Sequence, residues 1–281
     1  MLPFVLLVPY AQVASQGPVL LPPPLRALVE AKDWAGTAEW FESVPPATRG
    51  RYYEVWLQAL NRLGRWDRLL SLSEALQAQL EKDGVARLGT YRLYRAQALS
   101  QLQRHPEAAL AHAENGRLGH PAGLPNACAE ARLAQDWASL LGLAEEVLGK
   151  QAEAPEALAW KGEALARLTR YVEAEPLLRA AVAKDPRHAF AWNNLGRCLN
   201  ERKAWAQAAE ALDQALALDP GQVEALYNRG RARFEQKRYP DSRDDFRAAL
   251  VLLPGDPVLA ENLRQAERYA ALPVPKSARR K

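Results

Sequence analysis

The sequence predicts an all-α protein of the α-solenoid class, in which antiparallel helix pairs stack one on the next. Three observations lead to this prediction. Residues that favour helices, above all Ala, Leu, Glu, Gln and Arg, dominate the 281-residue chain, and its 16 Gly and 20 Pro leave room for long helices. A block of 34 residues repeats without a gap in the C-terminal half, and small residues occupy fixed columns of that block. A hydrophobic share of 48% with 25% charged residues excludes a disordered chain and a protein with many membrane spans.

The first segment, residues 1–19, is apolar and has two interpretations. Residues 13–15, Val-Ala-Ser, have the small side chains of a signal-peptide cleavage site, which would make the protein exported or periplasmic. No Lys or Arg precedes Arg26, so the positive charge that opens a signal peptide is missing. The other interpretation is an apolar arm that packs on the first helices of a cytoplasmic protein. The apolar run is too short to span a bilayer, so integral membrane insertion is not expected.

Residues 20–154 carry degenerate repeats, which a column of aromatic residues marks. The gap between Trp66 and Trp137 is 71 residues and holds two repeats, with the segment around His105 as the missing second helix and a short insertion near Asp83-Gly84. This spacing predicts about seven repeat-like units in the chain. Irregular helical hairpins of a related type are the alternative for residues 18–154. The aromatic column consists of Trp34, Trp66, Trp137, Tyr171, Trp205 and Tyr239.

Residues 155–256 form three well-matched repeats, each predicted to be a helix pair. A glycine inside the first helix costs about 1 kcal/mol relative to alanine, so close approach of the second helix is the expected compensation. A proline follows the second helix and ends it, because the residue before a proline disfavours helical geometry. Besides the aromatic column, the matching columns are Gly162, Gly196 and Gly230, then Ala174, Ala208 and Ser242, then Ala181, Ala215 and Ala249, then Pro186, Pro220 and Pro254.

These columns resemble the tetratricopeptide repeat (TPR) family, whose 34-residue helix-turn-helix unit carries W-x2-L-G-x2-Y, then A-x3-F, A and P. The resemblance implies a right-handed superhelix whose concave face, lined by the first helices, binds a peptide or a partner helix. In the best block the matching residues are Trp192, Leu195, Gly196, Leu199, Ala208, Leu212, Ala215 and Pro220.

The C-terminal end is predicted to be a helix and a tail. Residues 257–272 are expected to form a capping helix, because the last repeat of an array would otherwise expose an apolar face. Residues 273–281 are basic and rich in proline, and we expect them to be disordered. The formal charge of the chain is +4, which Lys276, Arg279, Arg280 and Lys281 supply alone, so the body has no net charge to attract nucleic acid.

Helical spacing places two polar stripes on the exposed face of the first helices, because residues i, i+3 and i+4 share a face. Asparagine and arginine there suit a protein or peptide ligand that is acidic or ends in a free carboxylate. Some family members hold such a carboxylate with a clamp of Lys and Asn, but Ala159, Glu163 and Glu224 replace clamp residues here, so the clamp is absent or altered. Asparagine at Asn194 and Asn228 also has a purely structural interpretation, because it is common in the repeat. The predicted groove residues are Asn193, Asn194, Arg197, Asn200, Tyr227, Asn228, Arg231 and Phe234.

Motifs for catalysis or cofactor binding are missing from the sequence, so we expect no enzyme activity, no cofactor and no metal. It contains no GxxxxGK[ST] and no GxSxG, and the four histidines show no HExxH or other metal-ligand spacing. Cys128 and Cys198 lie two repeats apart, so we expect two buried small residues and not a disulfide. The tryptophans of the repeat columns are expected in the core.

The sequence therefore predicts a non-enzymatic scaffold that binds a partner protein or peptide in a concave groove. A structural subunit of an envelope or secretion assembly, using the convex face and the ends, is the alternative. A third hypothesis, a nucleic-acid adaptor, depends on the basic tail alone.

Overall fold

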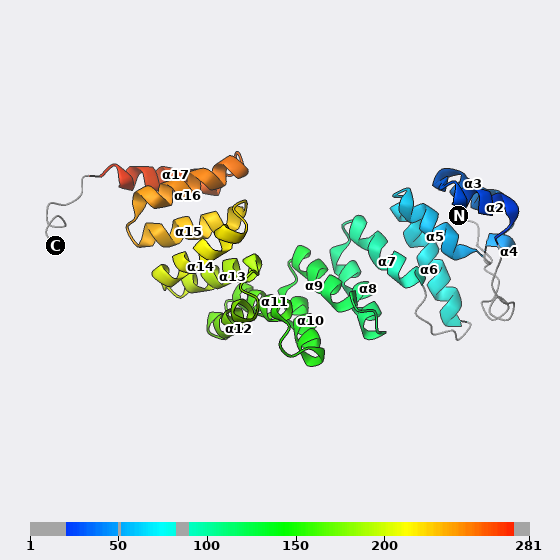
Figure 1. Ribbon diagram of the computed structural model, residues 1–281, viewed down its shortest axis with the longest axis horizontal. Coiled ribbons are helices and arrows are strands. Elements are labelled where there is room, and N and C mark those ends of the chain that lie inside the picture. The colour runs from blue at the N-terminus through cyan, green and yellow to red at the C-terminus, as the bar shows by residue number, and fades with distance from the viewer. Residues whose placement is uncertain (1–20, 50–51, 83–89, 273–281) are drawn as a thin grey trace. The chain divides into compact units, whose positions relative to one another are not determined.

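The computed structural model describes residues 21–49, 52–82 and 90–272, and every regular element within these ranges is an α-helix (Figure 1). The all-α repeat fold that the sequence predicts is confirmed. The chain divides into two compact units, Met1–Asp136 and Trp137–Lys281. No helix of the described ranges is long and apolar enough to cross a membrane. The N-terminal apolar segment, the insertion near Asp83-Gly84 and the basic tail lie outside the described residues.

The first unit has an aromatic and leucine-rich core. Trp56 is buried there and stacks on Phe41, with ring centroids 5.3 Å apart and an interplanar angle of 7°. Leu25, Leu60 and Tyr91 are also fully buried in this cluster. The helices of the unit are α2 (Pro23–Glu30), α3 (Trp34–Ser43), α4 (Pro46–Arg49), α5 (Tyr53–Arg62), α6 (Trp66–Lys82), α7 (Thr90–Gln101), α8 (His105–Arg117) and α9 (Gly123–Leu133).

The second unit contains the three well-matched repeats. Alanine and leucine dominate its core, with Leu178, Leu212 and Phe246 among the buried side chains. Its helices are α10 (Trp137–Lys150), α11 (Pro155–Arg167), α12 (Tyr171–Lys184), α13 (Ala189–Glu201), α14 (Trp205–Leu218), α15 (Val223–Glu235), α16 (Tyr239–Leu252) and α17 (Pro257–Ala270).

One turn geometry joins the two helices of a pair. A residue in the left-handed conformation lies two positions before the residue that opens the second helix, and the chain between the helices closes with hydrogen bonds such as Ala204 N to Leu199 O at 2.9 Å. Within the described residues, seven such turns occur, which agrees with the predicted number of repeats. The segment around His105 is the second helix of one pair, as predicted. The left-handed residues are Lys32, Gly64, Gln103, Gln135, Thr169, Lys203 and Lys237, with φ between 56° and 67°.

The glycine column of the second unit lies where the two helices of a pair cross. A Cβ atom added at Gly196 would lie 2.4 Å from Cγ of Leu212, and one added at Gly162 or Gly230 would meet Leu178 or Phe246 at 2.6 and 2.7 Å. The predicted close approach is therefore confirmed, and its partner is the side chain of the A-x3-F column.

The proline column ends the second helices as predicted. Asp185 and Asp219, which precede Pro186 and Pro220, are extended, with φ/ψ of −128°/91° and −142°/93°. The residue before Pro254 leaves the helix in the same way. The prolines therefore separate one repeat from the next.

The aromatic column opens the second helices, but its tryptophans are only half-buried. Trp192 in α13, which is also expected in the core, packs against it but is only partly buried. Trp34, Trp66, Trp137 and Trp205 are likewise partly exposed, so the expectation that they are buried is wrong, although Trp66 packs against the core. The cause is their position at the first residue of a helix, where the ring covers the turn beside solvent. Among the described tryptophans, Trp56 is the one that is fully buried.

Candidate functional site

The first helices of the second unit carry the predicted groove residues. Helix α11 packs on α13, and α13 packs on α15, so these three helices form one continuous surface, which we call the first-helix face. The predicted residues lie on α13 and α15.

The four predicted asparagines are not exposed. Asn193, Asn194, Asn200 and Asn228 are between 1% and 5% exposed, so the expectation of an exposed stripe is wrong for them. Packing of α15 on α13 covers them, and Asn200 Nδ2 donates to the backbone oxygen of Asn228 at 2.8 Å. Asn228 Nδ2 in turn donates to Asn193 Oδ1 at 3.4 Å, and Asn194 Nδ2 donates to Phe190 O at 3.1 Å. These side chains connect neighbouring repeats and hold the floor of the first-helix face in place.

Arg197 is the predicted residue best placed to meet a ligand. Its guanidinium is half-buried, and Nη2 donates to Asn194 Oδ1 at 3.0 Å. Within the described residues no carboxylate lies in ion-pair distance of it. Burial lowers the pKa of Arg197, and the nearby charge of Arg167 lowers it further, while Glu163 and Glu224 oppose the change. The site therefore contains a desolvated cation that its surroundings neutralise only in part.

Arg167 on α11 extends this cationic surface. Its Nη2 lies 4.0 Å from the buried carboxylate of Glu163 and 3.9 Å from that of Glu224, which is exposed. Sequence reasoning missed Arg167, although it follows Glu163 by one helical turn and so shares its face. The two glutamates replace clamp residues, and the structure places both beside the arginines.

The aromatic residues of the predicted set have structural partners. Phe234 contacts Tyr239 and Tyr269, with ring centroids 5.2 and 5.3 Å apart, and belongs to an aromatic cluster with α17. Tyr227 packs against Phe246 at 6.0 Å. Arg231 lies over the Tyr227 ring at 5.9 Å and pairs with Glu201 at 3.0 Å, so its charge is already balanced. Among the eight predicted residues, Arg197 and Arg231 are charged, and within the described part of the chain Arg197 has no ion pair of the kind that Arg231 forms with Glu201.

A second polar site lies in the first unit. His112 and His120 line a cavity of about 410 Å³ with Ser100 and Glu130. His112 Nε2 lies 3.3 Å from Ser100 Oγ, and His105 Nδ1 lies 2.8 Å from Glu130 Oε2. Burial lowers the pKa of His112, against the opposing charge of Glu130. In the described ranges no three His, Cys, Asp or Glu side chains are arranged to hold a metal ion.

The two cysteines are buried and free, as the sequence predicts. Cys198 Sγ donates to Tyr171 O at 3.4 Å, and burial raises the pKa of this thiol to about 11. A thiol with so high a pKa is a poor nucleophile at neutral pH.

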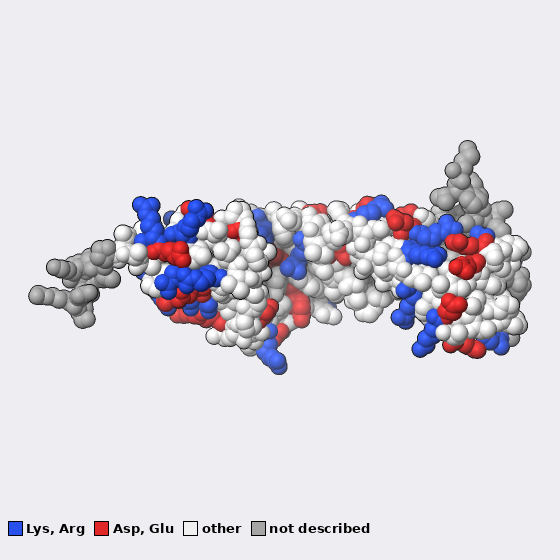
Figure 2. Space-filling view, turned by 90° about the horizontal axis from the view of Figure 1, so that it is seen from above, with Lys and Arg blue, Asp and Glu red and all other residues white. Residues whose placement is uncertain are grey.

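The surface charge of the molecule is mixed in sign. Figure 2 shows Lys and Arg side chains next to Asp and Glu side chains on the face in view. Ion pairs between neighbouring helices, such as Arg247 with Glu267 at 3.0 Å, account for part of this pattern.

A family model of the tetratricopeptide repeat matches residues 130–189, 161–223 and 204–257. Among solved structures, a thermophilic TPR protein of Thermus thermophilus is similar with a TM-score of 0.51 and 18% identity, over 64% of this chain and 98% of that chain. MamA of Desulfovibrio magneticus RS-1 is similar with a TM-score of 0.50 and 21% identity, over 58% and 93% of the two chains. The first TPR of Spaghetti (RPAP3), bound to an HSP90 peptide, has a TM-score of 0.41 and 24% identity, over 42% and 94%. The comparison with curated proteins found no match. The similarities to the Thermus thermophilus protein and to MamA support the fold.

Proposed function

Because this chain is a tetratricopeptide repeat protein, with matched repeats between residues 130 and 257, we propose that it is a non-enzymatic scaffold that binds an acidic segment of a partner protein on its first-helix face. Repeats of this kind serve protein–protein interaction, since stacked first helices present a long, preformed surface. The proposed ligand is a peptide or helix with Asp or Glu side chains, or with a free terminal carboxylate.

The observation that carries this proposal is the state of Arg197. A half-buried guanidinium without a paired carboxylate in the described residues is costly, and a ligand carboxylate would complete its hydrogen bonding. Arg167 lies on α11, which packs on the α13 helix of Arg197, so both guanidinium groups belong to the same first-helix face.

The buried asparagines support the proposal in a second way. Asn200 and Asn228 fix α13 against α15 through side-chain hydrogen bonds, so the surface is already formed before a ligand arrives. Binding to a preformed surface loses little conformational entropy on the protein side. The asparagines thus position the arginines and are not themselves expected to contact the ligand.

A random heptapeptide library with free C-terminal carboxylates, screened with the purified full chain, tests the proposal. We expect Asp and Glu to be enriched among the bound peptides, with affinities measured afterwards by fluorescence anisotropy. Arg197→Gln should weaken the selected peptides about ten-fold, the loss expected for a charge-assisted hydrogen bond. Arg268→Gln, which removes an exposed arginine from α17, should leave binding unchanged. Peptides without acidic enrichment, or equal binding by Arg197→Gln, would exclude this function.

The assembly-subunit alternative is favoured by one observation. Val251, Leu252 and Leu253 at the end of α16 and Val258 in α17 are exposed apolar residues, with Val251 at 73% exposure. Clustered apolar residues at the end of a repeat array are suited to a contact with another protein. Val251→Ser together with Val258→Ser should remove an assembly contact and leave acidic-peptide binding intact, which pull-down and anisotropy measure separately.

A further inference from the structure

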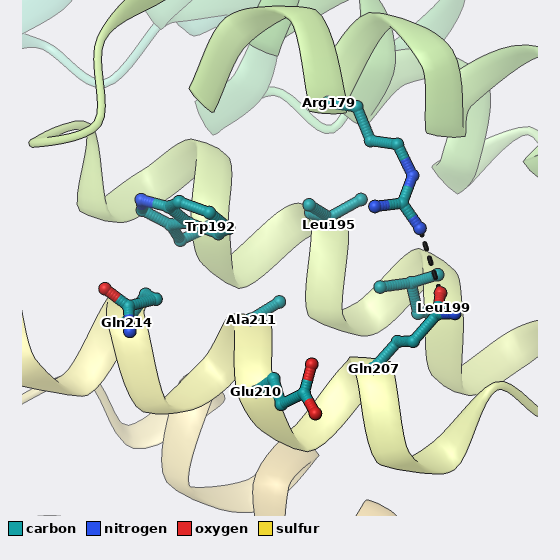
Figure 3. Close-up of a pocket in the computed structure, with 8 residues that line it drawn as sticks. All are labelled: Arg179, Trp192, Leu195, Leu199, Gln207, Glu210, Ala211 and Gln214. Atoms are coloured by element: carbon teal, nitrogen blue, oxygen red, sulfur yellow. Dashed lines mark hydrogen bonds between the residues drawn. The ribbon is translucent and has the colours of Figure 1, made fainter. Parts of the chain in front are cut away.

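A cavity of about 590 Å³ opens between α12, α13 and α14 (Figure 3). Its floor is apolar and comes from α13 and from Ala211 of α14. Its rim is polar. The lining residues are Arg179, Trp192, Leu195, Leu199, Gln207, Glu210, Ala211 and Gln214.

In the two flanking repeats, basic side chains of the chain itself occupy the corresponding positions. Lys161 on α11, one repeat before Leu195, pairs with Glu145 of α10 at 3.0 Å. Arg229 on α15, one repeat after Leu195, pairs with Asp213 at 2.6 Å and with Asp245 at 2.7 Å. In both flanking repeats, a basic residue of the first helix therefore pairs with an acidic residue of a second helix.

The repeat between them has lost these partners. Leu195 and Leu199 stand where the next repeat has Arg229 and Arg233. Likewise Arg179 stands in the column of Asp213, and Ala211 in the column of Asp245. Leucine and alanine have shorter side chains than the arginine and aspartate in the same columns of the next repeat. The space that the longer side chains fill there is therefore left open as a cavity.

The charges at the rim show what would fit the cavity. Arg179 is already bound, since its Nε donates to Glu175 at 2.8 Å and its Nη2 donates to Gln207 at 2.9 Å. Glu175 also pairs with Arg202. Glu210 is the lining carboxylate, and within the described residues it has no hydrogen bond or ion pair. Figure 3 shows its side chain on α14, between those of Ala211 and Gln207.

Trp192 adds an aromatic wall. Its indole Nε1 donates to Pro186 O at 2.9 Å, which fixes the ring at one end of the cavity. An indole face attracts cations and packs against aliphatic chains.

We propose that this cavity is a second binding site, which takes a lysine or arginine side chain of a partner protein. The aliphatic stem would pack on Leu195 and Leu199, and the cationic head would pair with Glu210. The partner thereby supplies the kind of side chain that Lys161 and Arg229 supply in the flanking repeats. The lining shares no residue with the predicted groove, and the site does not depend on the acidic ligand proposed for the first-helix face.

Titration of the ¹⁵N-labelled full chain with single-residue probes tests the site, with the Trp192 indole N–H resonance as the reporter. The probes are the N-acetyl methylamides of arginine, lysine, norleucine and glutamate. We expect arginine and lysine to give saturable shifts, with norleucine at least about five-fold weaker, because it has the stem without the charge. A norleucine probe that binds as well as lysine, or the absence of any saturable shift, would overturn the proposal.

Two variants at Glu210 and one matched control complete the experiment. Glu210→Gln should weaken lysine and arginine probes about five-fold, as expected for a partly exposed ion pair of about 1 kcal/mol. Glu210→Lys should reverse the preference toward the glutamate probe. Glu235→Gln removes an exposed glutamate from α15 and should change nothing. All three variants should keep acidic-peptide binding on the first-helix face, so failure at one site is distinguishable from failure at the other.

Discussion

The left-handed residue in each repeat turn is a source of strain wherever it is not glycine. An L side chain in this conformation costs about 1–2 kcal/mol, because its Cβ atom approaches the following carbonyl oxygen. Thr169 has a φ of 63°, and its branched side chain makes it the most strained member of the column. Gly64 shows that glycine fits the same position, with a φ of 67°.

Thr169→Gly should therefore stabilise the protein by about 0.5–1 kcal/mol, after the larger entropy of glycine in the unfolded chain is subtracted. Urea unfolding followed by circular dichroism measures the change. Arg170→Gly, at the next residue with a φ of −88°, has no strain to relieve and should destabilise. Stabilisation by both variants would show that strain is not the cause.

His112 makes the first unit sensitive to acid. Its folded pKa lies below its ordinary value of about 6.5, so the unfolded chain takes up the proton first. Stability should therefore fall as the pH drops below about 6.5. His112 occupies the column of Leu178 and Leu212, seven residues after the residue that opens the second helix, so His112→Leu should reduce this loss. The measurement is the free energy of unfolding on either side of that pH, and an equal loss in both proteins would contradict the prediction.

Because the asparagines are buried and hydrogen-bonded, we expect their replacement to lower stability more than replacement of a surface polar residue. Asn200→Ala should destabilise by about 1–3 kcal/mol, because it removes the bond to Asn228 O and leaves a buried polar group without a partner. Asn262→Ala removes a side-chain bond that stays within α17, to Val258 O, and should change stability by about 0.5 kcal/mol or less. Thermal denaturation compares the two variants, and equal effects would refute the role assigned to Asn200.

Asn200 also shows how far the sequence could predict the site. Helical periodicity correctly places Asn193, Asn200 and Asn228 on faces shared by neighbouring first helices. It does not show that the next first helix covers them, because that depends on the packing distance between repeats. Arg197 is more exposed than the asparagines of the same helix, although burial still lowers its pKa.

At the scale of helices, crossing points depend on a glycine in the first helix and a large side chain in the second. Gly196→Ala would bring a Cβ atom to 2.4 Å from Cγ of Leu212, so the Leu212 side chain or the helix that carries it must shift. We expect a loss of about 1–3 kcal/mol, the usual effect of overpacking, although alanine is the better helix former. Gly142→Ala in α10 is the matched control, because nothing lies within 4 Å of its added Cβ, and it should stabilise by up to about 1 kcal/mol. Chemical denaturation measures the stability of both variants. If Gly196→Ala stabilised the protein, the close contact between Gly196 and Leu212 would not be the reason for the glycine.

Helix boundaries were predictable from the sequence because the turn imposes them. Every member of the aromatic column is the first residue of a helix. His105 has the same position in α8, although it is neither Trp nor Tyr. The ionic cluster of Arg229, Arg233, Asp213 and Asp245 was not predictable, because its four residues come from three helices. The absence of such ion pairs around Leu195 was not predictable either, although the alignment of the repeats places Leu195 in the column of Arg229.

At the scale of the whole molecule, α17 packs on α16, as the predicted capping helix would. Leu259 and Ala266 of α17 are buried against the cluster that contains Phe246, and Tyr269 joins the rings of Phe234 and Tyr239. A chain that ends at residue 256 should have a lower Tm and should self-associate, because the apolar side of α16 becomes exposed. Light scattering and calorimetry measure both effects, and a monomer of unchanged Tm would show that α17 is dispensable. Deletion of residues 273–281 alone is the control.

The constant turn between paired helices makes each repeat an interchangeable part. Since Asp219 and Leu253, the residues before Pro220 and Pro254, both leave the second helix with similar φ angles of −142° and −127°, a 34-residue block cut at these prolines starts and ends in similar backbone geometry. Gene duplication can therefore lengthen this protein by whole blocks without a new kind of junction. Each added block would bring one more position equivalent to Leu195 and Arg229, where a leucine leaves a cavity open and an arginine fills it with an ion pair.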